Sequence, residues 1–238
     1  MNELGEHQTG YRIVRFGDVP WERRTEDDWP PLVKRMVRDP EHDLAVNIIW
    51  YARGVVEPRH VHDATHATWV LLGSAEMDGE RIGPGDLVYG PSAVPHGPLT
   101  YEMGCLLFGT LKGITLHSAV GDDHPTPPGD GIPAHLATSA PRPWQSGTPG
   151  DAAEVRTLVE DRARGYVARM IRWRAGSRTP TQVRSGAHAA LIVGGSAVVD
   201  GQTLGPWDLI YAAGDAARGG IEFPEDCTMI VNSIGADR

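Results

Sequence analysis

Four histidines lie within one short stretch of the chain, at a spacing that could bring them to a single metal ion. His60 and His62 are two positions apart, so on a β-strand both imidazoles project from the same face. His66 follows after a gap of three residues, which is long enough for a tight turn into a second strand. His96 comes after the turn-forming sequence Gly-Pro-Gly-Asp at 83–86. Four imidazoles could therefore converge inside one small barrel.

The elements that must position these histidines are short strands separated by turns. The chain has 238 residues, and its 29 Gly and 19 Pro favour many turns over long helices. Runs rich in β-branched and aromatic residues predict strands at 44–51, 68–72, 87–89, 105–110, 166–173, 189–193, 209–211 and 228–231. One helix is expected at 30–37, with two prolines in its first turn and an Asp-Pro pair at its end.

The chain also repeats itself at a fixed offset. A shift of 122 residues aligns residues 54–97 with residues 176–219, and 16 of these 44 positions are identical without a gap. Two copies of one unit imply two similar domains. We expect an N-terminal domain at 1–116 that includes a leader segment, a Pro/Gly-rich linker at 117–150 and a C-terminal domain at 151–238.

The motifs around the histidines resemble those of the cupin superfamily. The first copy reads Gly54-x5-His60-x-His62-x3-His66-x6-Gly73, followed by Pro-x-Asp at 84–86 and Pro-His at 95–96. The resemblance implies an all-β fold of two tandem cupin barrels, each a double-stranded β-helix or jelly roll, and thus a bicupin. In the family two His, a Glu and a final His hold the metal. Here a histidine, His66, stands at the usual Glu position.

This departure changes the chemistry that the site favours. Neutral imidazoles leave the charge of a divalent ion uncompensated, which favours Zn, Fe(II), Ni, Co or Cu over Mg or Ca. We expect one such metal per chain in the N-terminal barrel, with Fe as the first choice, held by His60, His62, His66 and His96. His66 either completes the ligand set or turns away and acts as a base beside three ligands.

The second copy lacks most of these ligands. The four histidines map to Gln182, Arg184, His188 and Arg218, so we expect no metal there. The two arginines either form a fork for a carboxylate or phosphate, or lie at the barrel lip while the copy completes the fold. The remaining histidines are interpreted as surface residues: His7, His42, His117, His124 and His135.

Residues for proton transfer are harder to assign from the sequence. Thr68, Val70 and Leu72 alternate with His66 along one strand, which predicts a partly apolar wall near the metal. Glu57 and Tyr89 are the two candidates chosen as catalytic general acid or base. Further candidates for proton transfer or stacking are Trp50, Tyr51, Trp69 and Glu102.

Three function hypotheses follow, and the expected partner is a small-molecule substrate. The segment 89–98 resembles the hydroxyacetophenone-dioxygenase and anti-sigma-factor branch of the cupins, which implies a non-haem Fe(II) dioxygenase of diketones, hydroxyketones or phenols. All-His cupins also occur among cyclases of aromatic polyketide pathways, which implies a redox-neutral Zn, Ni or Co cyclase, isomerase or lyase. A non-catalytic binding or sensor protein is the third hypothesis.

Composition bears on partners and location. The net charge of −9 disfavours nucleic acid and anionic membranes, and no apolar run is long enough to span a bilayer. The first residues lack the pattern of a signal peptide, so a cytoplasmic protein is expected. Cys105 and Cys227 occupy equivalent positions of the two copies and are expected to be buried thiols, not a disulfide. A homodimer through edge strands stays open, because two fused copies could satisfy that pairing within one chain.

Overall fold

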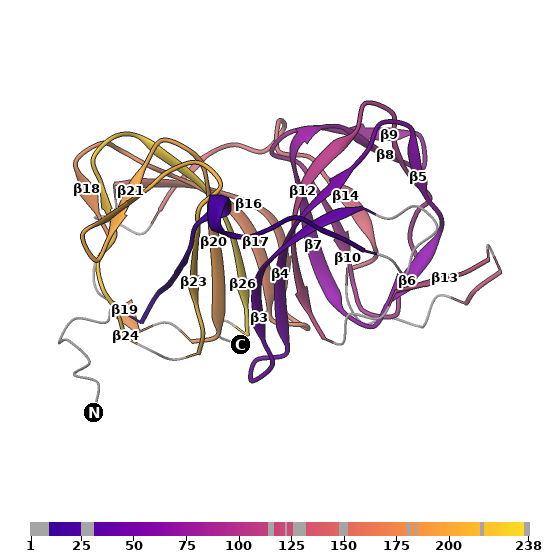
Figure 1. Ribbon diagram of the computed structural model, residues 1–238, viewed down its shortest axis with the longest axis horizontal. Coiled ribbons are helices and arrows are strands. Elements are labelled where there is room, and N and C mark those ends of the chain that lie inside the picture. The colour runs from indigo at the N-terminus through magenta and orange to yellow at the C-terminus, as the bar shows by residue number, and fades with distance from the viewer. Residues whose placement is uncertain are drawn as a thin grey trace.

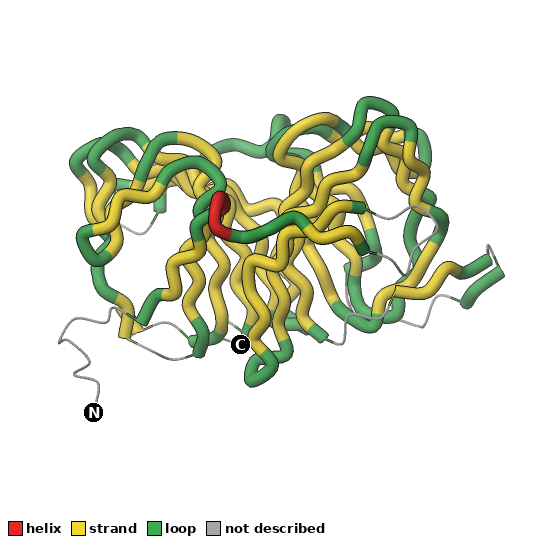
Figure 2. The backbone as a smooth tube through the Cα atoms, viewed as in Figure 1, coloured by secondary structure: helices red, strands yellow, loops and turns green. Residues whose placement is uncertain are grey.

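The computed structural model shows an all-β protein built from two barrels that lie side by side (Figure 1). It describes residues 10–24, 31–113, 117–121, 123–125, 132–147, 152–179, 182–183, 185–214 and 217–235. Within these ranges the only helix is the 3-10 turn Phe16–Asp18, drawn in red in Figure 2. None of the described helices is long and apolar enough to cross a membrane. The predicted fold class, two tandem jelly-roll barrels, is confirmed.

The first barrel is made of a large sheet, a small sheet and a strand pair, all antiparallel. The large sheet has the order β14-β10-β7-β12-β4-β3-β2 and the small sheet the order β5-β11-β8-β9, while β6 pairs with β13. The strands of the large sheet are β2 (Glu22–Arg23), β3 (Leu32–Asp39), β4 (Leu44–Tyr51), β7 (Thr65–Gly73), β10 (Leu87–Gly90), β12 (Cys105–Lys112) and β14 (His135–Ala137). The others are β5 (Val55–Glu57), β6 (His60–His62), β8 (Ala75–Met77), β9 (Glu80–Ile82), β11 (Leu99–Tyr101) and β13 (His117–Ala119).

The second barrel repeats this plan. Its large sheet has the order β1-β23-β20-β26-β17-β16-β15, its small sheet the order β18-β25-β21-β22, and β19 pairs with β24. The strands of the large sheet are β1 (Arg12–Val14), β15 (Gln145–Ser146), β16 (Ala153–Asp161), β17 (Tyr166–Trp173), β20 (Ala187–Gly194), β23 (Leu209–Ala212) and β26 (Cys227–Ile234). The others are β18 (Ser177–Arg178), β19 (Gln182–Val183), β21 (Ala197–Val199), β22 (Gln202–Leu204), β24 (Ala217–Arg218) and β25 (Glu222–Phe223).

The structure follows the sequence repeat closely. A shift of 122 residues carries β4, β8, β9, β10 and β12 onto β17, β21, β22, β23 and β26 with identical bounds. The β-bulge that omits Leu71 from the β7–β12 register recurs at Val193 between β20 and β26. Every strand expected from the sequence is present, with ends that agree or extend by a few residues.

The predicted helix at 30–37 is wrong, because this segment contributes to strand β3. The side chains of β3 are buried in pairs, Val33 with Lys34 and Met36 with Val37, which imitates a helical pattern. The cause is a β-bulge between Arg35 and Val37, where the register against β4 shifts by one residue. A bulge resets the alternation of faces, so the apolar spacing no longer shows the period of two that identifies a strand.

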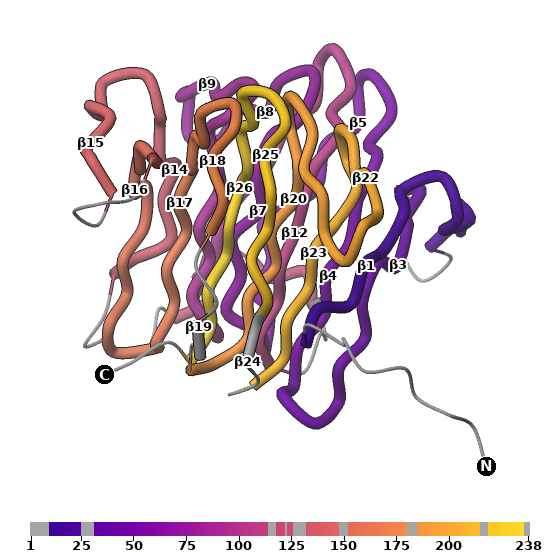
Figure 3. Tube along the Cα trace, turned by 90° about the vertical axis from the view of Figure 1, so that its left-hand side faces the viewer, coloured from indigo at the N-terminus to yellow at the C-terminus, as the bar shows by residue number. Residues whose placement is uncertain are grey.

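The two large sheets pack against each other and bury the main hydrophobic core between the barrels (Figure 3). Polar groups inside this interface are paired. The Trp69 indole Nε1 donates to Asn232 Oδ1 at 2.9 Å, and the Tyr89 hydroxyl donates to Asp161 Oδ2 at 2.7 Å. Because a buried polar group without a partner is costly, these bonds fix how one barrel sits on the other.

The leader and the linker each add strands to the barrels. The leader strand β1 pairs with β23 of the second barrel, whereas β2 pairs with β3 of the first barrel. Linker strand β14 joins the first barrel's large sheet and β15 joins the second barrel's. The expected free thiols are confirmed: Cys105 and Cys227 are buried and unbridged, and burial raises the pKa of each to about 12.

Candidate metal centre

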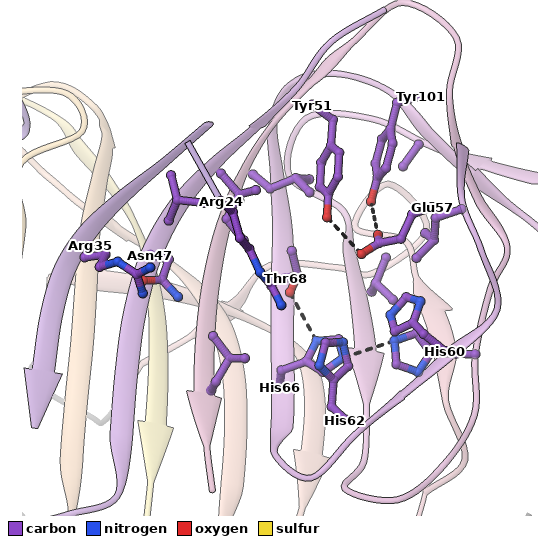
Figure 4. A pocket seen from close by; sticks show the side chains of 18 of the residues that line it. Arg24, Arg35, Asn47, Tyr51, Glu57, His60, His62, His66, Thr68 and Tyr101 are labelled. Carbon is purple, nitrogen blue, oxygen red and sulfur yellow. Dashed lines mark hydrogen bonds between the residues drawn. The ribbon is translucent and has the colours of Figure 1, made fainter. Parts of the chain in front are cut away.

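The four histidines of the first copy come together inside the first barrel (Figure 4). His60 and His62 lie on β6, and their ring centroids are 4.8 Å apart. His96 lies in the loop after β10 and is bound to His60 by two backbone hydrogen bonds, of 2.9 and 3.0 Å. This pairing sets the two rings 4.4 Å apart. His66 comes from β7, and its Nε2 lies 3.2 Å from Nε2 of His96.

Hydrogen bonds on the far side of two rings orient them for metal binding. His60 Nδ1 lies 2.7 Å from the Pro58 carbonyl, and His96 Nδ1 lies 3.1 Å from the Val94 carbonyl. A carbonyl oxygen only accepts, so each Nδ1 carries the proton and each Nε2 presents its lone pair to the cavity. Metal-bound histidines in proteins usually show this arrangement.

Three of the histidines lie close enough together to share one metal ion. The nearest ligand atoms of His60, His62 and His96 all lie within 4.8 Å of one another, so this cluster could bind an ion. With metal–nitrogen bonds of about 2.1 Å, neighbouring ligands in octahedral or tetrahedral geometry stand roughly 3.0–3.4 Å apart. The 3.2 Å between the Nε2 atoms of His66 and His96 falls in this range. A ligand set made only of imidazoles would favour Fe(II), Zn, Ni, Co or Cu.

The His66 ring has room only because a glycine faces it. Gly90 on β10 pairs directly with His66, and a Cβ atom built on Gly90 would lie 2.2 Å from His66 Nε2. On its other side, His66 Nδ1 lies 3.1 Å from Thr68 Oγ1. The equivalent position in the second barrel is Ala212.

A buried acid lies in the same cavity as the histidines. Glu57, at the end of β5, accepts hydrogen bonds from the hydroxyls of Tyr51 at 2.8 Å and Tyr101 at 2.9 Å. The two phenol rings are stacked with centroids 4.2 Å apart. Burial, together with the nearby Glu57 carboxylate, raises the pKa of Tyr101 well above its ordinary value. Tyr101 therefore stays protonated and donates to Glu57.

The cavity that these groups share has a volume of about 370 Å³, which suits a small molecule. Besides the histidines and the Glu57 cluster, its walls contain the apolar side chains Val33, Ile49, Val88, Leu99, Leu107 and Leu111. Three arginines and Asn47 also line it: Arg24, Arg35 and Arg38. None of these four polar residues was expected from the sequence to line the cavity. Asn47 alternates with Ile49 and Tyr51 on β4, so strand parity could have found it.

Tyr89, chosen as a catalytic candidate, lies elsewhere. Paired residues of neighbouring strands point to the same face, and Tyr89 pairs with Ala67, whereas the cavity-facing His66 pairs with Gly90. The Tyr89 ring is fully buried between the barrels, where its hydroxyl meets Asp161. Burial raises its pKa, and so does this hydrogen bond. Tyr89 thus serves the barrel interface.

The other candidates divide between the cavity and the outside. Glu57, Tyr51 and Thr68 line the cavity, while Leu72 is exposed beyond the bulge at Leu71. Trp50 and Glu102 are exposed, Trp69 is in the interface, and His42, His124 and His135 lie away from the cavity. His7 lies outside the described residues, and His117 is described only by its backbone pairing with His62.

The second barrel keeps the scaffold, and three of the four histidine positions hold other residue types there. The backbones of Gln182 and Arg218 pair, as those of His60 and His96 do in the first barrel. Arg184 lies outside the described residues. His188 Nδ1 lies 2.8 Å from Ser233 Oγ, and its Nε2 lies 3.1 Å from the Ser185 carbonyl. Both ring nitrogens of His188 are thus engaged by neighbouring protein groups.

Comparison with known proteins agrees with this architecture. Residues 10–114 match the family described as "ChrR Cupin-like domain". A stretch of 64 residues is 39% identical to dimethylsulfoniopropionate lyase DddQ from Ruegeria pomeroyi, and this match covers 25% of the chain and 32% of the lyase. The chain thus matches about a third of the length of this curated relative.

Solved structures with the same fold cover most of the chain. A "putative dioxygenase" from Nostoc punctiforme superposes with a TM-score of 0.80 at 12% identity, over 97% of this chain and 83% of that one. A variant of Bacillus subtilis oxalate decarboxylase OxdC gives 0.66 at 14% identity, over 98% and 79%. A variant of salicylate 1,2-dioxygenase from Pseudoaminobacter salicylatoxidans gives 0.62 at 15% identity, over 81% and 70%. At these identities the likeness shows the fold alone.

Proposed function

This chain is a member of the cupin superfamily, and we propose that its first barrel is a metal-dependent active site for a small oxygenated substrate. We further propose that the reaction is a dioxygenation that uses Fe(II), with a diketone, hydroxyketone or phenol as substrate. Both atoms of O₂ would then enter the product. The second barrel would complete the fold and carry no reaction.

The observation that carries the proposal is the placement of a buried acid beside the histidines in one cavity. Residues that are similar at equivalent positions of both barrels are explained by the shared fold, whereas residues found only in the first barrel are explained by its site. Trp173 and Phe223 stack in the second barrel, with centroids 4.8 Å apart, at the positions of Tyr51 and Tyr101. The aromatic stack therefore belongs to the fold, and only the first barrel adds the two hydroxyls.

Glu57 is likewise specific to the first barrel. Its equivalent in the second barrel is Thr179, and that barrel also lacks three of the four histidines. The phenol hydroxyls, the carboxylate and three of the four histidines thus occur together in one copy and are absent together from the other. This joint occurrence supports a shared chemical task.

The histidines and the acid have separate roles in this proposal. His60, His62 and His96, joined by His66, would hold the ion. When bound, the ion would supply Lewis acidity and open coordination positions for a pair of substrate oxygens. Glu57 would accept the proton that such a substrate loses on enolisation or ionisation.

The surroundings of Glu57 suit a proton acceptor. Each carboxylate oxygen accepts one phenol hydrogen bond, which fixes the orientation of the group in the cavity. Side chains such as Val88, Leu99 and Leu107 form the nearby walls and limit the access of water. A proton transferred to Glu57 would remain next to Tyr51 and Tyr101.

A redox-neutral lyase or isomerase is the second candidate, and the sequence similarity to the lyase DddQ favours it. The same proton removal by Glu57 would then be followed by loss of a leaving group, with no consumption of O₂. The two candidates share the metal ligands and the acid. They differ in whether oxygen is a substrate.

The test is turnover of a panel of diketones, hydroxyketones and phenols by the Fe(II)-loaded protein, with and without oxygen. We expect product only with oxygen, one O₂ consumed per product, and at least a hundredfold loss of kcat in Glu57→Gln. Glu102→Gln is the matched control, since Glu102 is exposed and pairs with Arg81 outside the cavity. Equal turnover without oxygen would replace the dioxygenase by the redox-neutral candidate. Metal retention with no turnover of any substrate would favour a binding protein.

A further inference from the structure

Three paired residues form a row across the cavity wall next to the histidines. Asn47 on β4 pairs with Gly109 on β12, and Gly109 pairs with Thr68 on β7. Directly paired residues of neighbouring strands point to the same face of a sheet, and both Asn47 and Thr68 line the cavity. Neighbouring strands lie about 4.8 Å apart, so roughly 10 Å separate the two ends of the row.

The Thr68 end of this row adjoins the metal ligands. Its Oγ1 lies 3.1 Å from Nδ1 of His66, whose Nε2 lies 3.2 Å from Nε2 of His96. Figure 4 shows Asn47 on the side of the cavity away from His60 and Glu57, with Thr68 between them. A molecule bound at the histidines could therefore extend along the row to Asn47.

The amide at the far end of the row lacks a partner. Asn47 is only 8% exposed, and its Oδ1 atom is buried with no hydrogen-bond partner in the described part of the chain. Arg35, which pairs with Asn47 across β3 and β4, directs its Nε to Glu22 instead. Rotation about the last side-chain bond exchanges Oδ1 and Nδ2, so the amide can present either atom to the cavity. Because a buried amide without hydrogen bonds is costly, it indicates a ligand group that completes it.

The glycine in the middle of the row leaves space that the fold does not need. A Cβ atom built on Gly109 would lie 3.5 Å from Thr68 Oγ1 and 3.6 Å from Ile49 Cδ1, which is ordinary contact. The backbone of Gly109 is not in the left-handed region, so alanine would fit there without strain. A glycine inside a strand weakens the strand, and it often marks a place where a ligand approaches the backbone closely.

The second barrel forms the same row without these residues. Asn47, Gly109 and Thr68 correspond there to Arg169, Val231 and Ala190, which pair in the same order. Val231 and Ala190 pack against the hydrophobic core of that barrel. The strands therefore tolerate a valine at the glycine position. The open, polar row belongs to the first barrel's cavity.

We infer that Asn47 and Gly109 determine substrate specificity, with a substrate whose end away from the histidines carries a hydroxyl group. The hydroxyl binds the Asn47 amide, and the carbon chain that leads to it lies over Gly109. A hydroxyl both donates and accepts, so it matches either atom of the amide. The apolar side chains Ile49 and Leu111 line the same cavity and suit the carbon chain. This inference rests on the proposed function for the end of the substrate that reaches the histidines.

The test uses a series of alkane-2,4-diones of increasing chain length that end either in a hydroxyl or in a methyl group of similar size. All of them present the same diketone to a metal. Dissociation constants are measured by calorimetry on the metal-loaded and on the metal-free protein. An apolar wall would favour the methyl compound. We expect instead that, at the chain length that reaches Asn47, the hydroxyl compound binds about tenfold more tightly.

Two variants assign this preference to the row. Asn47→Leu keeps the size of the side chain and removes the amide, so the methyl compound should bind more tightly than the hydroxyl compound. Gly109→Ala should weaken binding of the long diketones about tenfold by overpacking the cavity, and leave pentane-2,4-dione unchanged, because this short probe reaches only the metal. Gly194→Ala is the matched control, since Gly194 lies on a strand of the second barrel and nothing lies within 4 Å of its Cβ.

Thermal unfolding of the metal-free protein separates a role in binding from a role in folding. Asn47→Leu removes an amide without a partner, and Gly109→Ala lowers the conformational freedom of the unfolded chain. Both variants should therefore unfold at the wild-type temperature or above it. A lower unfolding temperature in both variants would show that the fold itself needs these residues, and would contradict the inference.

The binding outcomes separate this inference from the proposed function. If the methyl compound binds at least as tightly as the hydroxyl compound at every chain length, the inference is wrong, even where pentane-2,4-dione binds only to the metal-loaded protein as the proposed function requires. A hydroxyl preference that depends on Asn47 would support the inference even if the metal made no difference, which would instead contradict the proposed function. A preference that survives Asn47→Leu would overturn the assignment to Asn47.

Discussion

Replacing Gly90 by alanine should weaken metal binding although no ligand is removed. The new Cβ would lie 2.2 Å from His66 Nε2, whereas ordinary van der Waals contact begins at about 3.4 Å. The ring must therefore move by about 1.2 Å. The backbone of Gly90 is not in the left-handed region, so alanine itself introduces no strain there. The change acts on the position of one imidazole.

The expected size follows from how precisely ligands must be placed. A displacement of this size exceeds the roughly 0.5 Å within which a binding group must be held. Changes that disturb the support of a metal ligand typically cost ten- to a hundredfold in affinity, or about 1.4–2.7 kcal/mol. The stability of the metal-free protein should fall by less, because the His66 ring can move into the open cavity.

The assay is a chelator competition that gives the dissociation constant of Zn(II) or Co(II), with thermal unfolding of the metal-free protein as the check on folding. Gly83→Ala is the control, because nothing lies within 4 Å of its Cβ and its backbone also tolerates alanine. An unchanged affinity in Gly90→Ala would show that His66 is not a ligand. His66 would then be the base beside three ligands.

Three further changes test the barrel interface and a turn. The pKa of Asp161 lies below its ordinary value, because the hydrogen bonds that it accepts, above all from Tyr89, outweigh the effect of burial. Asp161→Asn should therefore destabilise the protein at neutral pH, and the difference from wild type should shrink below about pH 4 in urea unfolding; a constant difference would contradict this. Asn232→Ala should cost about 2–4 kcal/mol of unfolding free energy, since Trp69 and a buried threonine lose their partners; a loss below 0.5 kcal/mol would refute the reasoning. Gly73→Ala should prevent stable folding, because its Cβ would lie 2.0 Å from a backbone oxygen at φ +79°, and native circular dichroism would contradict that.

The repeat explains why so much of the fold could be predicted from one sequence. A strand predicted in one copy is supported by the same pattern 122 residues away in the other copy. Turns such as Asp78-Gly79 and Asp200-Gly201 indicate the strand ends at equivalent positions of both copies. The segment at 30–37 falls before the aligned stretch, and its bulge hides the strand period. That is where the one predicted helix was wrong.

The site could be predicted only where spacing along the chain carries the information. His60 and His62 share a face of one short strand, so their proximity follows from the sequence. The face of the sheet to which Tyr89 points depends on the register between β7 and β10, and alternation along a single strand does not give that register. The presence of Arg24 and Arg35 in the cavity wall could be predicted only from the order of the strands around the histidines. Contacts between distant segments are set by tertiary packing and leave no local pattern.

The measurement that tests the central claim most directly is the metal content of gently purified protein. It would be compared with His96→Ala and with His188→Ala, which removes a histidine of the second barrel. We expect about one transition metal per chain in the wild type and in His188→Ala, and its loss in His96→Ala; iron would support the dioxygenase. Absence of metal even after reconstitution, or full retention in His96→Ala, would contradict the metal centre and the function proposed from it.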